Sequence, residues 1–342
     1  MTTHHTSSPP ATASPFRPAW WLRGAHAQTL FAALCRRHPP LAMRQERWEL
    51  ADGDFLDLRF AGDDQASDRP TVLLLHGLQG SHKSAYIQGM MRAIVARGWR
   101  AVLIHFRGCG GELNRLPISY HSGHTEDLAH VIAEFQERQP HAPLAAVGYS
   151  LGGNVLLKRL AESGRDVGLK AAVAVSVPYD LGCAAERIER GFSRLYQWHL
   201  LRSLRHMVRE KLQVTPGALP LTEADINALR TFRLFDDQVT APMHGFAGVE
   251  DYYTRCSSGP MLSRIQTPTL LIHARNDPFM TPAAVPDATA LPDHVQLELS
   301  RDGGHVGFVA GRYPWAPTYY LERRIPDYLA AFLPEQPARA SE

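Results

Sequence analysis

The chain has 342 residues, of which 44% are hydrophobic and 20% are charged, with 26 glycines and 25 prolines. This composition excludes low-complexity, collagen-like and fully solvated chains, and it predicts a folded protein with a buried core. The 36 basic and 34 acidic side chains leave a formal net charge of +2, so no overall field attracts nucleic acid and no nucleic-acid partner is expected.

The two ends of the chain are expected to be tails, over residues 1–15 and 336–342. The first is rich in Thr, Ser, His and Pro and lacks the basic start and apolar run of a secretory signal. No apolar run approaches the 18 residues of a membrane span, and the four cysteines form no CxxC pair. We therefore expect a cytoplasmic protein with reduced thiols.

Strand and helix patterns alternate along the chain. After an N-terminal strap over residues 16–34, two strand-like runs on either side of Asp52-Gly53-Asp54 predict a β-hairpin. Further strands are predicted over residues 71–75, 101–106, 145–148, 171–177, 269–273 and 295–299, and helices over residues 84–97, 125–138, 151–163 and 319–332. This alternation predicts an α/β fold with a mostly parallel central sheet flanked by helices.

A helix-rich segment interrupts the strand pattern. We expect a helical lid inserted over residues 180–262, which divides the core into a first part over residues 16–179 and a second part over residues 263–335. Residues 187–211 of this lid contain seven basic and two acidic side chains interleaved with apolar ones. Such a helix can contact a membrane or a lipid aggregate, but a lid helix that covers a pocket with its apolar face is the favoured interpretation.

The strongest motif is Gly148-Tyr149-Ser150-Leu151-Gly152-Gly153, a G-x-S-x-G pattern between a predicted strand and a predicted helix. Small flanking residues permit a tight turn that lifts the serine hydroxyl above the sheet edge. Ser150 is therefore predicted to be a nucleophile, and the amide of Leu151 at the helix start is predicted to donate to an oxyanion. The loop His76-Gly77-Leu78-Gln79-Gly80 follows strand 71–75 and offers the amide of Leu78 as the second donor.

A serine hydroxyl needs a base to take its proton and a carboxylate to orient that base. Asp277 follows strand 269–273, and His305 lies in the glycine-rich loop Gly303-Gly304-His305-Val306-Gly307 after the last strand. These two residues are the predicted acid and base, in the chain order expected for this arrangement. His273 and His294 compete for the role of base, but a core position and a surface position are expected for them.

Substrate contacts are predicted for aromatic residues near the nucleophile and in the lid. Tyr149 precedes the nucleophile, and Phe192, Tyr196 and Trp198 recur at spacings that place them on one side of a helix. An apolar lid face above the sheet edge predicts a preference for acyl chains of about four to ten carbons, because each buried methylene contributes roughly 0.8 kcal/mol.

Other polar residues carry weaker signals. Arg107, in a glycine loop after strand 101–106, either holds a substrate anion or braces loops, and bracing is favoured. Cys109 is expected to be a structural thiol, and a metal site at His121 and His124 is outweighed by ordinary loop roles. No metal site is predicted.

The motifs together resemble the YheT-like esterases of the α/β-hydrolase superfamily (the AB hydrolase-4 type). The resemblance covers nearly the whole chain after the tail. The motifs that carry it are Ala25-His26-Ala27-Gln28-Thr29-Leu30, His76-Gly77-Leu78-Gln79-Gly80-Ser81, Phe106-Arg107-Gly108-Cys109-Gly110-Gly111, Tyr120-His121-Ser122-Gly123, Gly148-Tyr149-Ser150-Leu151-Gly152-Gly153-Asn154, Arg275-Asn276-Asp277-Pro278 and Gly303-Gly304-His305-Val306-Gly307-Phe308.

The resemblance implies an α/β-hydrolase fold and a carboxylesterase or lipase-like serine hydrolase with the triad Ser150, Asp277 and His305. It implies an acyl-enzyme intermediate, no cofactor, and short- to medium-chain acyl esters or acylglycerols as small-molecule substrates. Acyl transfer to an alcohol and a non-catalytic binding or scaffold role are the alternatives. The intact triad disfavours the non-catalytic role.

Overall fold

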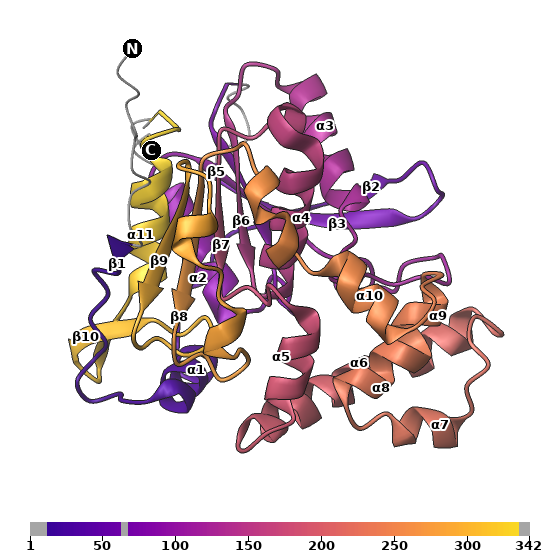
Figure 1. The fold of residues 1–342 in the computed structure, drawn as a ribbon. Helices are drawn as coiled ribbons and strands as arrows, with labels where there is room; N and C mark the ends of the chain where they lie inside the picture. The colour runs from indigo at the N-terminus through magenta and orange to yellow at the C-terminus, as the bar shows by residue number, and fades with distance from the viewer. Residues whose placement is uncertain (1–11, 63–67, 335–342) are drawn as a thin grey trace, which may run out of the picture.

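The computed structural model describes residues 12–62 and 68–334 (Figure 1). Within these residues nine strands form one sheet in the order β1-β9-β8-β7-β6-β4-β5-β3-β2. Their bounds are β1 (Thr12–Ala13), β2 (Arg44–Glu49), β3 (Phe55–Ala61), β4 (Thr71–Leu75), β5 (Arg100–Ile104), β6 (Leu144–Tyr149), β7 (Ala171–Val175), β8 (Thr269–Ala274) and β9 (Val295–Ser300). The pairs β2–β3 and β3–β5 are antiparallel and every other pair is parallel, as the alternating pattern predicted.

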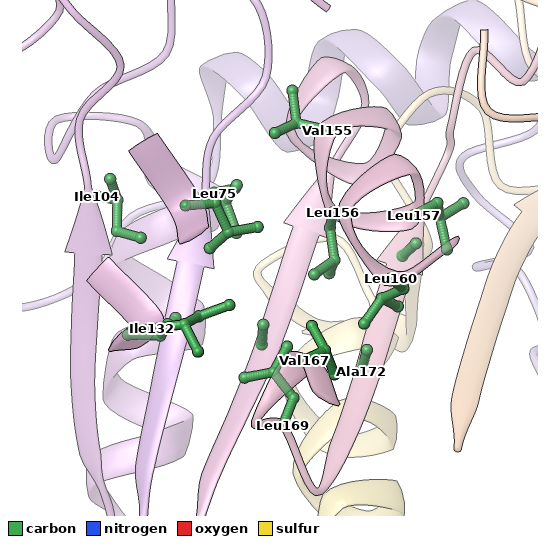
Figure 2. Packing of buried hydrophobic residues seen from close by; sticks show 14 of the residues in the cluster. Leu75, Ile104, Ile132, Val155, Leu156, Leu157, Leu160, Val167, Leu169 and Ala172 are labelled. Carbon is green, nitrogen blue, oxygen red and sulfur yellow. The ribbon is translucent and has the colours of Figure 1, made fainter. Parts of the chain in front are cut away.

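Helices cover both faces of the sheet. They are α2 (Ala85–Val95), α3 (Glu126–Arg138), α4 (Leu151–Ser163) and α11 (Tyr320–Leu329), whereas α1 (Ala25–Leu34) packs beside α2. Successive residues of a strand point to opposite faces, so Leu73 and Leu75 pack toward α3 and α4 whereas Val72 and Leu74 pack toward α2 and α11. Figure 2 shows the first of these two clusters, in which Leu156 and Leu160 of α4 lie against the sheet. Burial on both faces explains the continuous apolar runs of the central strands.

The chain between β7 and β8 is helical and projects to one side of the sheet (Figure 1). It contains α5 (Leu181–Ile188), α6 (Ser193–Val214), α7 (Glu223–Ala228), α8 (Phe232–Phe235), a π-helical turn (Asp236–Thr240), α9 (Ala241–Met243), α10 (Val249–Cys256) and a 3-10 turn (Gly259–Arg264). We call the segment 181–264 the lid. The predicted insertion over residues 180–262 coincides with it closely, and the division into domains stays a prediction.

The lid has its own apolar cluster, and a buried lysine is one of the residues that anchor it to the core. Leu201, Leu204 and Val208 of α6 pack against later lid helices. The ammonium of Lys211 donates to the backbone carbonyl and the side-chain oxygen of Asn114 at 2.7 and 2.8 Å and to the carbonyl of Leu116 at 2.6 Å. Hydrogen bonds from a charged donor are among the stronger ones, so these contacts hold the last turns of α6 against the core.

Three features differ from the predictions. Thr12–Ala13, expected in a tail, pairs with β9, and the strap contains the helix α1. A hairpin of β10 (Val309–Tyr313) and β11 (Ala316–Tyr319) was not predicted, because a bulge breaks the alternation of so short a pair. The remaining tail residues, 1–11 and 335–342, lie outside the described residues. No helix in the described part of the chain is long and apolar enough to cross a membrane.

Candidate active site

Ser150 lies at the sharp turn between β6 and α4. Its backbone has φ 51° and ψ −120°, a left-handed conformation that L-residues seldom adopt, and its amide donates to the carbonyl of Val175 at 2.8 Å. A Cβ on Gly148 would approach the carbonyl oxygen of Gly152 to 2.5 Å, and one on Gly152 would approach the carbonyl oxygen of His76 to 2.5 Å. The glycines of the motif are therefore required by the close approach of three backbone segments.

The predicted acid and base converge on this serine. His305 Nε2 lies 3.0 Å from Ser150 Oγ, and His305 Nδ1 lies 2.9 and 3.2 Å from the two carboxylate oxygens of Asp277. Asp277 follows β8 and His305 follows β9, so the three side chains meet at the carboxyl edge of the parallel strands. With Nδ1–H donating to the carboxylate, Nε2 is free to accept the serine proton.

Several neighbours that the motifs did not identify hold the acid and the base. The amide of Phe279 donates to Asp277 Oδ1 at 2.8 Å, and the Phe279 ring stacks on the His305 imidazole with centroids 4.0 Å apart. The His305 amide donates to Thr29 Oγ1 of α1 at 2.9 Å. Burial opposes ionisation of Asp277, but the charge and hydrogen bond of His305, together with the hydrogen bond of the Phe279 amide, outweigh it and lower the pKa of Asp277. The carboxylate is therefore ionised beside the imidazole.

Two backbone amides near Ser150 have no acceptor among the described residues, and they belong to Leu78 and Leu151. The amides on either side of Leu78 donate to the hydroxyls of Tyr86 and Tyr120 at 2.8 and 2.9 Å, which leaves only the middle amide of the loop available. A Cβ on the residue before Leu78 would lie 3.3 Å from the Ser150 Cβ, so the loop touches the serine. Two backbone amides near the serine are therefore available to donate to a bound oxygen atom.

A cavity with a volume of about 140 Å³ adjoins Ser150. It is bordered on the core side by Leu78, Tyr120, Leu151 and Phe279 and on the lid side by Ala184, Ile188, Leu200, Leu204, Met207 and Phe232. An engineered apolar cavity of similar volume holds a benzene-sized molecule. The wall is mostly apolar, which suits a hydrocarbon group.

The aromatic residues predicted to contact substrate do not line this cavity. Tyr149 is buried on the α2 face of the sheet with its ring 4.8 Å from that of Tyr86. Phe192 and Trp198 are 49% and 54% exposed, and Tyr196 lies behind Phe279, with its hydroxyl 3.1 Å from His26 Nδ1. We correct the prediction accordingly.

The physical reason is the rotation of α6 about its axis. Leu200, Leu204 and Met207 recur at i, i+4 and i+7 and face the cavity. Trp198 lies two residues from Leu200, about 200° away around the helix, and therefore faces solvent. Sequence spacing identified a helix with apolar residues but could not show which of them turns toward the nucleophile.

The remaining polar candidates occupy structural positions. Arg107 forms ion pairs with Asp52, Asp54 and Asp127 at 2.7 to 3.2 Å, which agrees with the bracing role. Burial raises the pKa of the Cys109 thiol to about 12, so it is not a reactive thiolate.

The alternative histidines do not reach the serine. His273 is buried in β8, and His294 Nε2 lies 2.6 Å from the carbonyl oxygen of Ile265. Near His121 and His124, as elsewhere in residues 12–62 and 68–334, no group of three or more His, Cys, Asp or Glu side chains is arranged to hold a metal ion.

Comparison with known proteins agrees with this architecture. A family model described as the alpha/beta hydrolase fold matches residues 70–311. The chain is 44% identical, over 94% of its length and 95% of the other protein, to the Escherichia coli protein named "Putative esterase YheT". It is 31% identical, over 95% of its length and 80% of the other protein, to human "Phospholipase ABHD3". Among solved structures, the Pyrococcus furiosus esterase Pf2001 is similar with a TM-score of 0.54 and 18% identity, over 86% of this chain and 92% of that one.

Proposed function

Because this chain belongs to the α/β-hydrolase fold family and to its YheT-like branch, we propose that it is a serine carboxylester hydrolase. The esterase and phospholipase names of its relatives support a hydrolase activity. The observation that carries the finer proposal is the hydrogen-bonded series from Ser150 Oγ through the His305 ring to the Asp277 carboxylate.

The proposed reaction has two steps. Ser150 Oγ attacks the ester carbonyl carbon while His305 Nε2 takes its proton, and the carboxylate of Asp277 stabilises the resulting imidazolium. The amides of Leu78 and Leu151 donate to the oxygen that becomes negatively charged. The imidazolium gives the proton to the leaving alcohol. Water then attacks the acyl-enzyme with His305 again as the base, and the proton returns to Ser150 Oγ as its bond to the acyl carbon breaks and the acid is released. The proposal includes no cofactor.

Labelling with a fluorophosphonate probe tests the nucleophile. We expect the wild type to be labelled and the Ser150→Ala variant to be unlabelled, with turnover of p-nitrophenyl butyrate reduced by about 10⁵- to 10⁶-fold, because the nucleophile has no substitute. Ser258→Ala is the matched control, since this buried hydroxyl has no hydrogen-bond partner in the described part of the chain. An unlabelled wild type, or an active Ser150→Ala variant, would refute the proposal.

We propose acyl esters of short to medium length, including acylglycerols, as the substrate class. The mostly apolar cavity beside Ser150 and its modest volume support this range. The four free cysteines support a location in the reducing cytoplasm.

We also propose that the lid makes peripheral contact with lipid surfaces. The first turns of α6 expose Leu195 and Trp198 beside the exposed arginines Arg194 and Arg202, and an interfacial helix needs this combination of apolar and basic groups. Co-sedimentation with anionic vesicles should fall several-fold in a Trp198→Ala, Arg202→Ala double variant, and binding to zwitterionic vesicles should be weak throughout. Trp315→Ala, which removes a tryptophan that is 80% exposed outside the lid, is the control. Equal binding by all three proteins would contradict the lipid contact.

A further inference from the structure

One carboxylate lies in the wall of the otherwise apolar cavity. Asp236 is the first residue of the π-helical turn that follows α8, and it borders the same cavity as Ser150. Asp236 is a partly exposed residue that lies among lid helices beside this cavity. π-Helical turns are rare and are frequently found at functional sites.

The hydrogen bonds of Asp236 come from uncharged groups. The Thr240 hydroxyl donates to Oδ1 at 2.7 Å and the Tyr253 hydroxyl donates to Oδ2 at 2.8 Å. No Lys, Arg or His of residues 12–62 and 68–334 forms an ion pair with this carboxylate within 4 Å. A carboxylate has about four acceptor positions, so the protein leaves part of the capacity of Asp236 unused.

This environment is unfavourable for a carboxylate unless a ligand completes it. Burial outweighs the two hydroxyl donors and raises the pKa of Asp236 to about 6, so much of it is still ionised at neutral pH. A purely hydrocarbon ligand would displace water from the carboxylate without replacing the lost hydrogen bond. A ligand with a hydrogen-bond donor would replace that bond.

We propose that Asp236 forms a polar subsite that accepts a hydrogen bond from a hydroxyl or ammonium group of the bound molecule. The proposal deepens the esterase proposal and rests on it only for the statement that the bound molecule is an ester. It predicts substrates that carry a donor along the chain in the cavity, and it predicts discrimination against plain alkyl chains of equal length. Sites built to bind a donor reject analogues that lack it more strongly than apolar sites distinguish one methylene.

Binding of unreactive alcohols tests the subsite separately from catalysis. The affinities of octan-1-ol, octane-1,8-diol, 1,8-dimethoxyoctane and 8-aminooctan-1-ol are measured by calorimetry, together with the six- and ten-carbon analogues so that chain length is covered. In the wild type we expect the diol of the best-fitting length to bind at least about tenfold more tightly than its dimethyl ether, which keeps both oxygens but has no hydrogen-bond donor. A dimethyl ether that binds as tightly as the diol at every length would overturn the proposal without any variant.

Variants then assign the effect to the carboxylate. Asp236→Leu should abolish the preference of the diol over the ether, and Asp236→Asn should keep much of it, because an amide oxygen is still an acceptor. A preference for the amino alcohol over the diol in the wild type, lost in Asp236→Asn, would identify ammonium as the donor, and its absence would identify hydroxyl. Glu250→Gln, which changes an exposed lid carboxylate, is the matched control.

The result is independent of the catalytic proposal. The alcohols have no ester bond, so the ratios can be measured in Ser150→Ala as well as in the wild type. If the wild type is not labelled by fluorophosphonate but still prefers the diol, the esterase proposal is refuted and the subsite proposal stands. A labelled enzyme whose diol preference survives in Asp236→Leu would refute the subsite and keep the esterase.

Discussion

Backbone strain in the described part of the chain is concentrated around Ser150. The non-glycine residues with positive φ there are Gln79, Ser150, Ser176, Val306 and Phe308. Gln79 follows Leu78, Ser176 follows β7, and Val306 and Phe308 follow His305. Ser176 Oγ also accepts a hydrogen bond from the Val306 amide at 3.1 Å, which ties the turn after β7 to the loop that carries the base. Strained conformations of this kind persist where the surrounding contacts hold them, and they cluster at functional sites.

At this scale we predict the effect of neutralising the acid. Asp277→Asn should lower kcat for a p-nitrophenyl ester by about 10³- to 10⁴-fold while the fold is retained, because the amide cannot stabilise the imidazolium and can hold the ring in the wrong tautomer. Asp293→Asn, a change at an exposed acid, should have no effect. Turnover within tenfold of the wild type in Asp277→Asn would mean that another group orients His305.

Among the elements, α5 and α6 determine what the cavity can hold. Ala184 of α5 and Leu200 of α6 both border the cavity, whereas Trp198 on the same helix as Leu200 faces solvent. The alanine is small, so its position leaves room that a larger side chain would fill.

We therefore predict that Ala184→Leu shortens the acyl preference. The added carbons should exclude about three methylenes of the acyl chain, at roughly 0.8 kcal/mol each, and so lower kcat/KM for the octanoyl ester on the order of 60-fold relative to the acetyl ester. The series acetyl, butyryl, octanoyl and palmitoyl measures this. Trp198→Ala should leave the series unchanged, and a uniform loss for all esters in Ala184→Leu would show that the acyl chain lies elsewhere.

At the scale of the whole molecule, the fully buried histidines His76, His105 and His273 are neutral in the folded state. Burial lowers the pKa of His76 to about 3 and those of His105 and His273 to about 4. His76 accepts a hydrogen bond from the amide of Phe106 at 3.2 Å, so it would lose this bond on protonation. In the unfolded chain each imidazole titrates near 6.5. Protons therefore bind the unfolded chain preferentially between pH 6.5 and about 4.

These histidines predict acid unfolding. Their contribution to stability is fully present above pH 6.5 and is lost as the pH falls toward 4, by about 1.4 kcal/mol per pH unit for each histidine. The free energy of unfolding in urea should therefore be steady from pH 7 to 8 and fall steeply between pH 6.5 and 5.

His273→Leu provides the matched comparison. Both ring nitrogens of His273 are buried without a hydrogen-bond partner in the described residues, so the substitution removes no hydrogen bond. Between pH 6.5 and 5 the free energy of unfolding of the variant should fall less steeply than that of the wild type. The difference between the two slopes should correspond to about one bound proton. Parallel pH profiles for the wild type and the variant would show that His273 is not responsible.

The positions along the chain of the strands from β2 to β9 and the mostly parallel sheet could be predicted because each βα unit has a local signal. A strand buried on both faces is a continuous apolar run, and a helix over the sheet repeats its apolar residues with a period of 3.6. The positions of Ser150, Asp277 and His305 followed from the same logic, since each lies in a loop at the end of such a strand. Parallel strands end at the same edge of the sheet, so the three loops were expected to lie close together.

The tertiary structure alone decided which lid side chains reach the cavity, and it revealed Thr29, Phe279 and Asp236. The Phe279 ring and the Thr29 hydroxyl contact His305 across long stretches of chain, and the position of Asp236 depends on how α8 and α10 pack. Local periodicity specifies that a helix has an apolar side, but the rotation of that helix against its neighbours depends on packing with residues distant in sequence. For this protein the sequence by itself determined which polar side chains follow the ends of the strands, and only side-chain packing decided the shape and polarity of the cavity.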